Sequence, residues 1–429
     1  MSDTPRKTSI TANRDFRLLF GGSTVSALGD QFTLVALPWL VLKLTGDAGA
    51  LGLVLAAMAL PRAMFMLIGG AIVDRMSPRR VLLVSRAVNA VFIGILAALV
   101  LGGAIQMWMV YLLALGIGLS TAFAYPAGSA ILPQLVEPQQ LQSANALFMT
   151  MRQLSMFVGP ALAGVVISLG AHKSAGTQTV ADASGMGLAF GIDAVSFLFS
   201  LGSLMLVRIH TDYHPPRPAG GVLADVASGI RTIWSDVSLR AFILYAAAVS
   251  VFVGGPIQVG LPVLANTRLD WGAASLGALM TANGGGVIIG GILSGFGTRL
   301  ARGRIGVMVL CIDSTVGLAI IGLTLVHSTL AGAGLLAVVG LLGGIAQISV
   351  FTWVQRRVSQ AMMGRTMSVL LFTFMGLGPI AAAVSGALLK IISLSVLFGG
   401  AGLVLTVFAL LCLTSPQMRG IGNTKPLPA

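Results

Sequence analysis

The sequence predicts an all-α polytopic membrane protein, and three observations carry that prediction. Of the 429 residues, 56% are hydrophobic and 9% are charged, against roughly 25% charged residues in soluble domains. The apolar residues fall in runs of about 20, the length with which an α-helix crosses roughly 30 Å of hydrocarbon. Short basic segments separate some of these runs, as in the cytoplasmic loops of membrane proteins. We therefore expect twelve transmembrane helices in two groups of six.

The predicted helices are joined by short turns, with a polar tail at each end of the chain. We expect a cytoplasmic tail at 1–14, a first six-helix bundle at 15–208, a cytoplasmic linker at 209–240, a second bundle at 241–413 and a cytoplasmic tail at 414–429. The apolar runs place the helices near residues 16–42, 48–73, 81–101, 107–127, 144–169, 187–207, 241–264, 273–298, 305–326, 330–354, 366–389 and 392–413.

The linker between the two predicted bundles contains the longest polar interval of the chain. Pro215, Pro216 and Pro218 interrupt it, because proline cannot continue a helix. Residues 222–234 have the pattern of an amphipathic helix that lies on the inner membrane surface.

The formal net charge of +13 indicates the orientation in the membrane and not a nucleic-acid partner. The hinge between the second and third apolar runs carries Arg75, Arg79 and Arg80, which is typical of a cytoplasmic loop. The loops on the opposite side hold few basic residues, namely Lys43, Lys173, Arg268 and Lys390. Both termini are therefore expected in the cytoplasm.

Three motifs of the first half recur in the second half at offsets of 225, 219 and 221 residues. Parallel six-helix repeats predict a pseudo-twofold axis along the membrane normal, with a cavity between the halves. The matched segments are 70–79 with 295–304, 159–160 with 378–379, and 134–143 with 355–364.

Several motifs resemble the major facilitator superfamily. The hinge Gly70-x₃-Asp74-Arg75-x₃-Arg79-Arg80 is similar to the family signature between helices 2 and 3, with Ser77 where the family usually has glycine. Gly159-Pro160-x₃-Gly164 resembles a shortened helix-5 antiporter motif. Segments 13–19, 28–30, 36–40 and 192–197 resemble a narrower bacterial branch of macrolide-efflux-type pumps and enterobactin-exporter-like proteins. The resemblance covers about residues 13–413 and implies the two-bundle fold of this superfamily and a place in the bacterial inner membrane.

One position departs from the pattern of many drug/proton antiporters of that superfamily. They have an arginine in helix 4, upstream of a glycine that corresponds to Gly116, whereas this chain has Leu112 and no charge in helix 4. If protons are exchanged, their site must therefore lie elsewhere.

Asp30 and Arg62 are the candidates for proton coupling, because ionisable groups inside a bilayer are costly and usually functional. Asp30 lies 14 residues into the predicted first helix, roughly 21 Å from its inner boundary. Arg62 lies 12 residues before Asp74 on the antiparallel second helix, roughly 18 Å from the same boundary. A conformational change that separates such a pair would switch the carboxyl group between proton-binding and ion-paired states. The alternative is a permanent bridge that only fixes packing.

Other polar residues inside the predicted helices are weaker candidates. We expect Asp193 and Asp313 to be hydrogen-bonded structural carboxylates, and Arg86 and Asn89 to lie near the inner interface, where arginine can extend its head group to water. Arg152, early in the fifth helix, is a candidate cavity charge.

The resemblance also implies roles for the two motifs and for a cavity wall. The residues of the hinge, Gly70, Asp74, Arg75, Arg79 and Arg80, would close an inner gate in the outward-open state, and simple positive-inside charge is the alternative. The helix-5 motif comprises Arg152, Gly159, Pro160 and Gly164, of which Gly159 and Pro160 would serve close packing or rocking of the halves. The cavity candidates are Gln31, Tyr125, Tyr245, Gln258, Gln347 and Phe351.

Together these features predict a secondary transporter that exports amphiphilic small molecules by alternating access, in exchange for protons. A lipid or lysolipid flippase of the same fold is the alternative. Cys311 and Cys412 lie in apolar runs, so we expect neither a disulfide nor a metal site, and no nucleotide-binding loop or catalytic set is visible. We expect a monomer without a cofactor, whose partners are a small amphiphile, protons and membrane lipids, and no nucleic acid.

Overall fold

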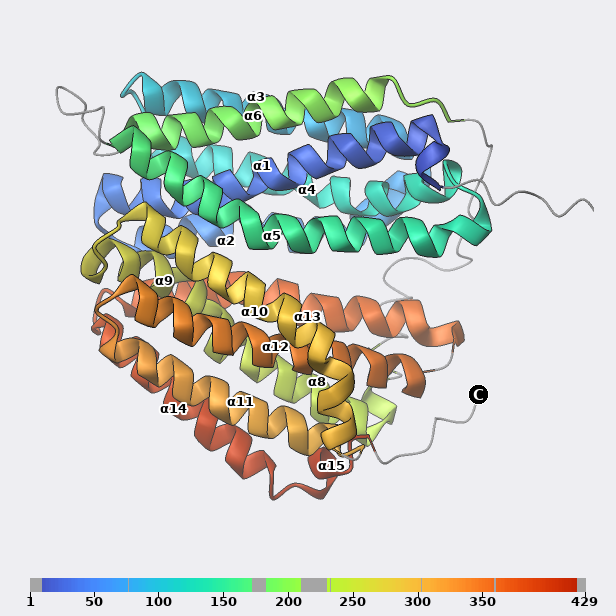
Figure 1. The fold of residues 1–429 in the computed structure, drawn as a ribbon, viewed down its shortest axis with the longest axis vertical. Helices are drawn as coiled ribbons and strands as arrows, with labels where there is room; N and C mark the ends of the chain where they lie inside the picture. Colours follow the sequence, from blue (N-terminus) through green and yellow to red (C-terminus); the bar gives the residue numbers. More distant parts are fainter. Residues whose placement is uncertain are drawn as a thin grey trace, which may run out of the picture.

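The computed structural model describes residues 10–75, 77–171, 183–209, 230–231, 233–301, 303–358 and 360–422. Throughout these residues the regular secondary structure is helical (Figure 1). The first half of the chain forms α1 (Arg14–Thr45), α2 (Ala48–Arg75), α3 (Pro78–Leu101), α4 (Met107–Ile131), α5 (Leu141–Ala171) and α6 (Ala183–Met205). Short 3₁₀ turns at Ile10–Ala12, Leu132–Gln134 and Pro138–Gln140 connect to α1 and α5.

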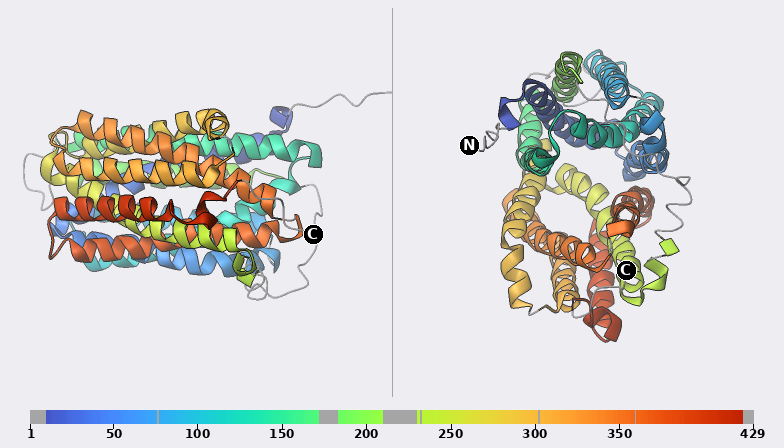
Figure 2. Two further views of the ribbon diagram at one scale, coloured as in Figure 1. Left: turned by 90° about the horizontal axis from the view of Figure 1, so that it is seen from below. Right: turned by 90° about the vertical axis from the view of Figure 1, so that its right-hand side faces the viewer.

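The second half repeats this plan with one interrupted helix. It forms α8 (Val237–Val249), η4 (Ser250–Gly254), α9 (Gly255–Arg268), α10 (Ala273–Leu300), α11 (Ile305–Gly322), η5 (Leu323–Leu325), α12 (Thr329–Arg357), α13 (Gln360–Leu388), α14 (Leu394–Cys412) and the short α15 (Pro416–Arg419). Seen along the helices, the two halves form two bundles side by side (Figure 2).

The helix prediction is confirmed. Ten helical segments in the described ranges are long and apolar enough to span a membrane, with α8, η4 and α9 counted as one segment. The other two predicted spans are α2 and α13, which are 28 and 29 residues long. The predicted amphipathic helix at 222–234 falls mostly outside the residues that the structure describes.

The predicted seventh helix, 241–264, differs from the structure in one respect. It begins earlier, at Val237, and contains a π turn at Ser250–Gly254 that ends two residues before Pro256. Proline has no backbone N–H, so the α-helical hydrogen bond at this point is lost and the turn can widen.

Each bundle begins with a capped helix that is tied to the end of the fourth helix of the same bundle. Asn13 caps α1 and donates from Nδ2 to the carbonyl of Leu135 at 2.7 Å. In the second bundle Asp236 caps α8 and pairs with Arg357 at the end of α12, with 2.6 Å between Oδ2 and Nε. Asn13 and Asp236 are 223 residues apart and Leu135 and Arg357 are 222 residues apart, in agreement with the offsets of the sequence repeat.

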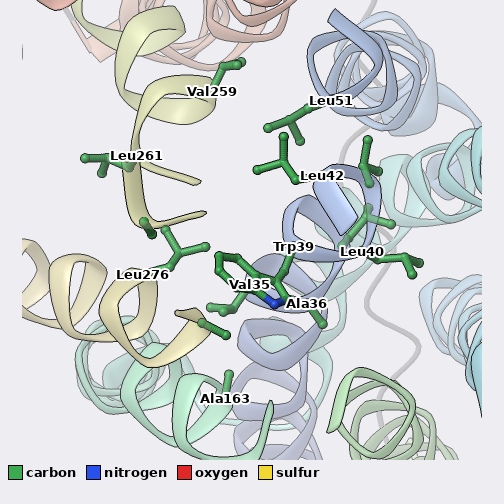
Figure 3. Close-up of a cluster of buried hydrophobic side chains, with 14 of the residues drawn as sticks. Val35, Ala36, Trp39, Leu40, Leu42, Leu51, Ala163, Val259, Leu261 and Leu276 are labelled. Atoms are coloured by element: carbon green, nitrogen blue, oxygen red, sulfur yellow. The ribbon is translucent and has the colours of Figure 1, made fainter. Parts of the chain in front are cut away.

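The buried apolar residues form one cluster shared by both bundles and two clusters that each belong to one bundle. The shared cluster joins the last turns of α1 to α2, α5, α9 and α10, at the end away from the start of α1 (Figure 3). We call the part of this cluster that is labelled in Figure 3 the plug; its side chains are Val35, Ala36, Trp39, Leu40, Leu42, Leu51, Ala163, Val259, Leu261 and Leu276. Toward the other end the bundles have separate cores and diverge (Figure 1).

Candidate transport site

Asp30 lies where α1 passes from an accessible region into the plug. From Gln31 to Leu42 every residue of α1 except Leu34 is buried, whereas Asp30 itself is exposed. The second bundle has the same boundary at Gln258, which is exposed and precedes the buried run from Val259 to Pro262. Asp30 and Gln258 therefore mark the inner limit of the plug in the two halves.

Three arginines from three helices surround Asp30. Arg86 of α3, Arg62 of α2 and Arg152 of α5 all act on the Asp30 carboxylate electrostatically, and Arg86 does so most strongly. All three are half-buried. The predicted neighbourhood of Asp30 and Arg62 is thus present, but Arg62 is one member of a larger cluster.

The sequence position of Arg86 suggested a place near the inner interface, but in the structure its side chain turns into the first bundle. Its guanidinium donates to the Ser26 hydroxyl at 2.5 Å and to the Ser23 hydroxyl at 3.3 Å, so it reaches from α3 into the bundle against α1. Asn89, one turn further on, is only 2% exposed, and its Oδ1 has no hydrogen-bond partner among the described residues. The side chains of Arg86 and Asn89 therefore both point into the first bundle.

A polar stripe on α1 carries these contacts, and sequence reasoning missed it. Ser23, Ser26, Asp30 and Thr33 follow one another at intervals of three, four and three residues, which places them along one helix face. Thr33 donates to the carboxylate of Asp193 on α6. The spacing was visible in the sequence, but serine and threonine occur in many positions of the spans and gave no separate signal.

The predicted cavity residues have different positions in the structure. Gln258 and Gln347 are exposed, and Phe351 is half-buried and stacks on Phe374 of α13 with 6.5 Å between ring centroids. Gln31 is 8% exposed and packs on Gly159, where an added Cβ would lie 2.4 Å from its Cγ. The side chain of Tyr125 lies outside the described residues.

Tyr245 is not a cavity residue. It is 3% exposed, stacks on Phe408 at 5.5 Å and donates from its hydroxyl to Asp313 of α11 at 2.7 Å. A phenol that is buried and hydrogen-bonded in this way stabilises the core of the second bundle. Asp313 is thus hydrogen-bonded, and its purely structural role stays a prediction.

The bundles contact each other through two pairs of glycines that are related by the repeat. In α2 and α13, a Cβ on Gly52 would lie 3.2 Å from the Cα of Gly386 and 2.7 Å from the carbonyl oxygen of Ala382. In α5 and α10, a Cβ on Gly164 would lie 3.2 Å from the Cα of Gly277. Both pairs lie at the same end as the plug, so the helices meet there without room for a side chain.

The helix-5 motif takes part in these contacts with two of its residues. Gly164 and the carbonyl of Pro160 pack on Gly277 of the other bundle, whereas Gly159 packs on Gln31 of its own bundle.

In the hinge motif, the side chains of Gly70, Asp74 and Arg75 are outside the described residues. Arg79 donates to the carbonyls of Leu204 and Met205 at 3.4 and 2.7 Å and so caps α6, and Arg80 is exposed.

A family profile described as "Major Facilitator Superfamily" matches residues 19–383, which is most of the chain. The chain belongs to the major facilitator superfamily. It is therefore a multi-pass membrane protein of a transporter family, as the resemblance implied.

Curated members of this superfamily align with nearly the whole chain. "Multidrug efflux pump Tap" of Mycobacterium tuberculosis (strain ATCC 25618 / H37Rv) is 27% identical over 94% of this chain and 94% of its own length. "Enterobactin exporter EntS" of Citrobacter koseri is 25% identical over 96% of this chain and 94% of its own length. The predicted branch is confirmed.

Solved structures of the superfamily share the fold at low sequence identity. A mutant of the nucleoside transporter NupG superposes with a TM-score of 0.73 at 12% identity, over 93% of this chain and 99% of that chain. A POT family transporter in complex with 5-aminolevulinic acid superposes with a TM-score of 0.72 at 14% identity, over 95% and 97%. These likenesses concern the fold alone.

On the plug side, an ion pair joins the two halves of this superfamily scaffold. Nζ of Lys390, after α13, lies 2.9 Å from Oδ2 of Asp47, before α2. Beside this pair the loops border a cavity of about 670 Å³ that Arg268 and Thr267 help to line. Burial opposes the charged form of Asp47, but hydrogen bonds from Lys390 and the Gly49 amide outweigh it, so the pKa of Asp47 is lowered.

Proposed function

We propose that this protein exports amphiphilic small molecules across the bacterial inner membrane by alternating access, in exchange for protons. The observation that carries the proposal is the accessible carboxyl group of Asp30, which lies among three arginines at the inner limit of the plug. The names of the two curated relatives, a multidrug efflux pump and an enterobactin exporter, support export as the direction.

The arrangement of the bundles supports alternating access. The bias of basic residues assigns the chain termini, and the side where the bundles diverge, to the cytoplasm. The plug and the two glycine pairs then close the outer side, so this conformation is inward-facing. Opening to the outside requires that the contacts of Gly52 with Gly386 and of Gly164 with Gly277 separate.

Rocking of rigid bundles alone would not move the arginines away from Asp30, because α1, α2, α3 and α5 belong to the same bundle. The helix that can move Arg62 is α2. Its first turns are held to α13 of the other bundle through Gly52, and Pro61 interrupts its hydrogen bonding directly before Arg62. Separation of the bundles would therefore bend α2 at Pro61 and shift Arg62 relative to Asp30.

This movement gives the exchange its direction. In the inward-facing state Asp30 is exposed and lies among the three arginines, and in this proposal it releases its proton toward the cytoplasm. In the outward-facing state one positive neighbour has moved away and Asp30 takes a proton from outside. The coupling needs no charge in helix 4, in agreement with Leu112 at that position.

The accessible groups near the bundle interface favour an amphiphilic substrate. Gln258 and Gln347 offer amides, and the stacked rings of Phe351 and Phe374 offer an apolar aromatic surface. The tight packing of α5 on α10 through Gly164 and Gly277 leaves no lateral opening at that contact, which supports export over lipid flipping.

The test is efflux of cationic ethidium, neutral Nile red and anionic calcein from cells that express the protein. We expect efflux of at least one dye that a protonophore stops and that Asp30→Asn abolishes at equal expression. Efflux that continues with the protonophore and in the variant would contradict proton exchange at Asp30. If none of the dyes leaves the cells but labelled lipid crosses liposomes containing the protein, the flippase is correct instead.

A further inference from the structure

A second carboxyl group lies beside Asp30 on the neighbouring helix α6. Asp193 is 0% exposed and accepts hydrogen bonds from the hydroxyl of Thr33 and, at 3.2 Å, from that of Ser196. Its Oδ1 lies 2.7 Å from the place that a Cβ on Gly29 would occupy, so only glycine at this position lets the carboxyl group reach α1. The two α1 residues next to Asp193, Gly29 and Thr33, flank Asp30 in the sequence.

Asp30 and Asp193 influence each other as like charges, and the positive groups lie on the side of Asp30. Asp30 acts on Asp193 electrostatically, whereas Arg86, Arg62 and Arg152 act on Asp30. The other helices packed on α1 are α4, α9 and α10. Their sequences contain no charged residue before Arg268 in α9 and Arg299 in α10, which lie at the ends of those helices, and the titratable groups of α4 are Tyr111 and Tyr125.

The two carboxyl groups differ in their access to water. Asp30 is exposed, and Asp193 has no exposed surface. Thr33 follows Asp30 by three residues and so lies on the same helix face, and its hydroxyl is already bonded to Asp193. For a relay, this hydroxyl would accept a proton from the Asp30 carboxyl group while it gives its own proton to Asp193.

We propose that Asp30 and Asp193 form one proton-binding pair, in which Thr33 passes the proton between an accessible and a buried carboxyl group. Two interacting carboxyl groups of this kind titrate as a unit. The pair would hold the imported proton away from water while the bundles change their orientation, and return it through Asp30 on the cytoplasmic side. The inference rests on the proposed function, because it assigns the place of the exchanged proton.

The test is infrared spectroscopy of the purified protein in lipid, in which the carboxylic acid C=O band is followed during a pH titration. The chain has 13 acidic side chains, so the pair is identified by difference: we expect a component of the titrating band in the wild type that is lost in Asp30→Asn and also lost or displaced in Asp193→Asn. Asparagine keeps a hydrogen-bond acceptor for Thr33, so a merely structural Asp193 would leave the titrating band of Asp30 unchanged. Asp313→Asn is the matched control, because it removes a buried carboxyl group of the second bundle and should leave this titration as it is.

The hydroxyl group is tested separately in the same measurement. Thr33→Ser should keep the wild-type titration and Thr33→Val should change it, while thermal unfolding shows that each variant is folded. A band lost in Asp30→Asn and unchanged in Asp193→Asn and Thr33→Val would overturn the pair and leave the proposed function intact. A titration that Asp30→Asn does not change would overturn the proposed function itself.

Discussion

The two bundles share their scaffold contacts and differ in charge. In each bundle the third helix bonds a hydroxyl of the first: Arg86 bonds Ser23 and Ser26 in one, and Asp313 bonds Tyr245 in the other. The first bundle adds Arg62, Arg152, Asp30 and Asp193 to this contact, whereas within the membrane-spanning segments of the second bundle Asp313 is the one carboxylate that the sequence contains. The repeat therefore supplies the framework in both halves, and the charged residues that the proposed exchange requires lie in the first bundle.

We expect the largest difference between the bundles in dye efflux, when the contact of the third helix with a hydroxyl of the first helix is removed in each. Arg86→Gln removes the hydrogen bonds of the guanidinium to two serine hydroxyls, and Tyr245→Phe removes the hydrogen bond to the Asp313 carboxyl group. A hydrogen bond to a charged group contributes about 1.5–3 kcal/mol to stability. Dye efflux should be lost in Arg86→Gln and kept in Tyr245→Phe, because Arg86 is among the groups that act on Asp30 and Tyr245 is not. Equal loss of efflux in the two variants would contradict a special role of Arg86 beside Asp30.

The glycine pairs should behave alike in the two halves. Gly52→Val and Gly277→Val each place methyl groups where an added Cβ would already lie 2.7 Å and 2.3 Å from carbonyl oxygens of the other bundle. We expect overpacking to cost about 1–3 kcal/mol in this inward-facing state alone. The equilibrium would shift roughly 5- to 150-fold toward the outward-facing state. Distance measurements between spin labels on the outer ends of α2 and α13 would show the shift, and Gly21→Val, with no atom within 4 Å of its Cβ, is the control.

The caps at the first helices should differ in strength. Asp236→Ala removes a helix cap and a buried ion pair with Arg357 and should lower the free energy of unfolding by about 2–4 kcal/mol. Asn13→Ala removes a neutral cap and one hydrogen bond and should lower it by about 1–2 kcal/mol. Denaturation of the purified variants measures both, and a larger loss for Asn13→Ala would contradict this order.

Acid should remove the contribution of the Asp236 cap. Burial opposes the charged carboxylate, but hydrogen bonds from Arg357 and from the Leu239 and Ser238 amides outweigh it, so the pKa of Asp236 is lowered. A lowered folded pKa stabilises the protein above the unfolded value of about 3.9 and ceases to do so as the pH falls through the folded value. The stability difference between wild type and Asp236→Asn should therefore shrink in that acidic range and stay constant near neutral pH.

The smallest effect is expected for the ion pair between the halves. The side chains of Lys390 and Asp47 are 56% and 36% exposed, so the pair contributes about 0.2–1 kcal/mol, and added salt should weaken it. Lys390→Gln should therefore shift the spin-label distances slightly toward the open outer side. A shift as large as that of Gly52→Val would mean that the ion pair, and not close helix packing, holds the outer side closed.

The fold could be predicted from the sequence because hydropathy and positive charge act locally along the chain. Helix existence followed from apolar runs, and the repeat followed from motifs such as Gly159-Pro160 and Gly378-Pro379. The π turn before Pro256 could not be predicted, because proline permits several local distortions. The boundaries of the bundles and the cytoplasmic tails remain predictions.

The candidate site could be predicted only in part. Asp30 and Arg62 were identifiable because charges are rare in the spans, and their similar depth follows from helix geometry. The role of Arg86 could not be predicted, because its depth suits the interface equally well and its direction depends on how α3 packs on α1. Tyr245 was misplaced for the same reason, since the sequence gives the helix but not the face that turns to the cavity.

The most direct test of the account is proton movement in proteoliposomes that contain the purified protein and a pH-sensitive dye inside. Addition of ethidium, or of the panel dye that cells export, should move protons against the substrate in the wild type. In Asp30→Asn the proton signal should vanish, and in Asp313→Asn it should remain. Proton movement that persists in Asp30→Asn would contradict the claim that the charges of the first bundle couple transport to protons.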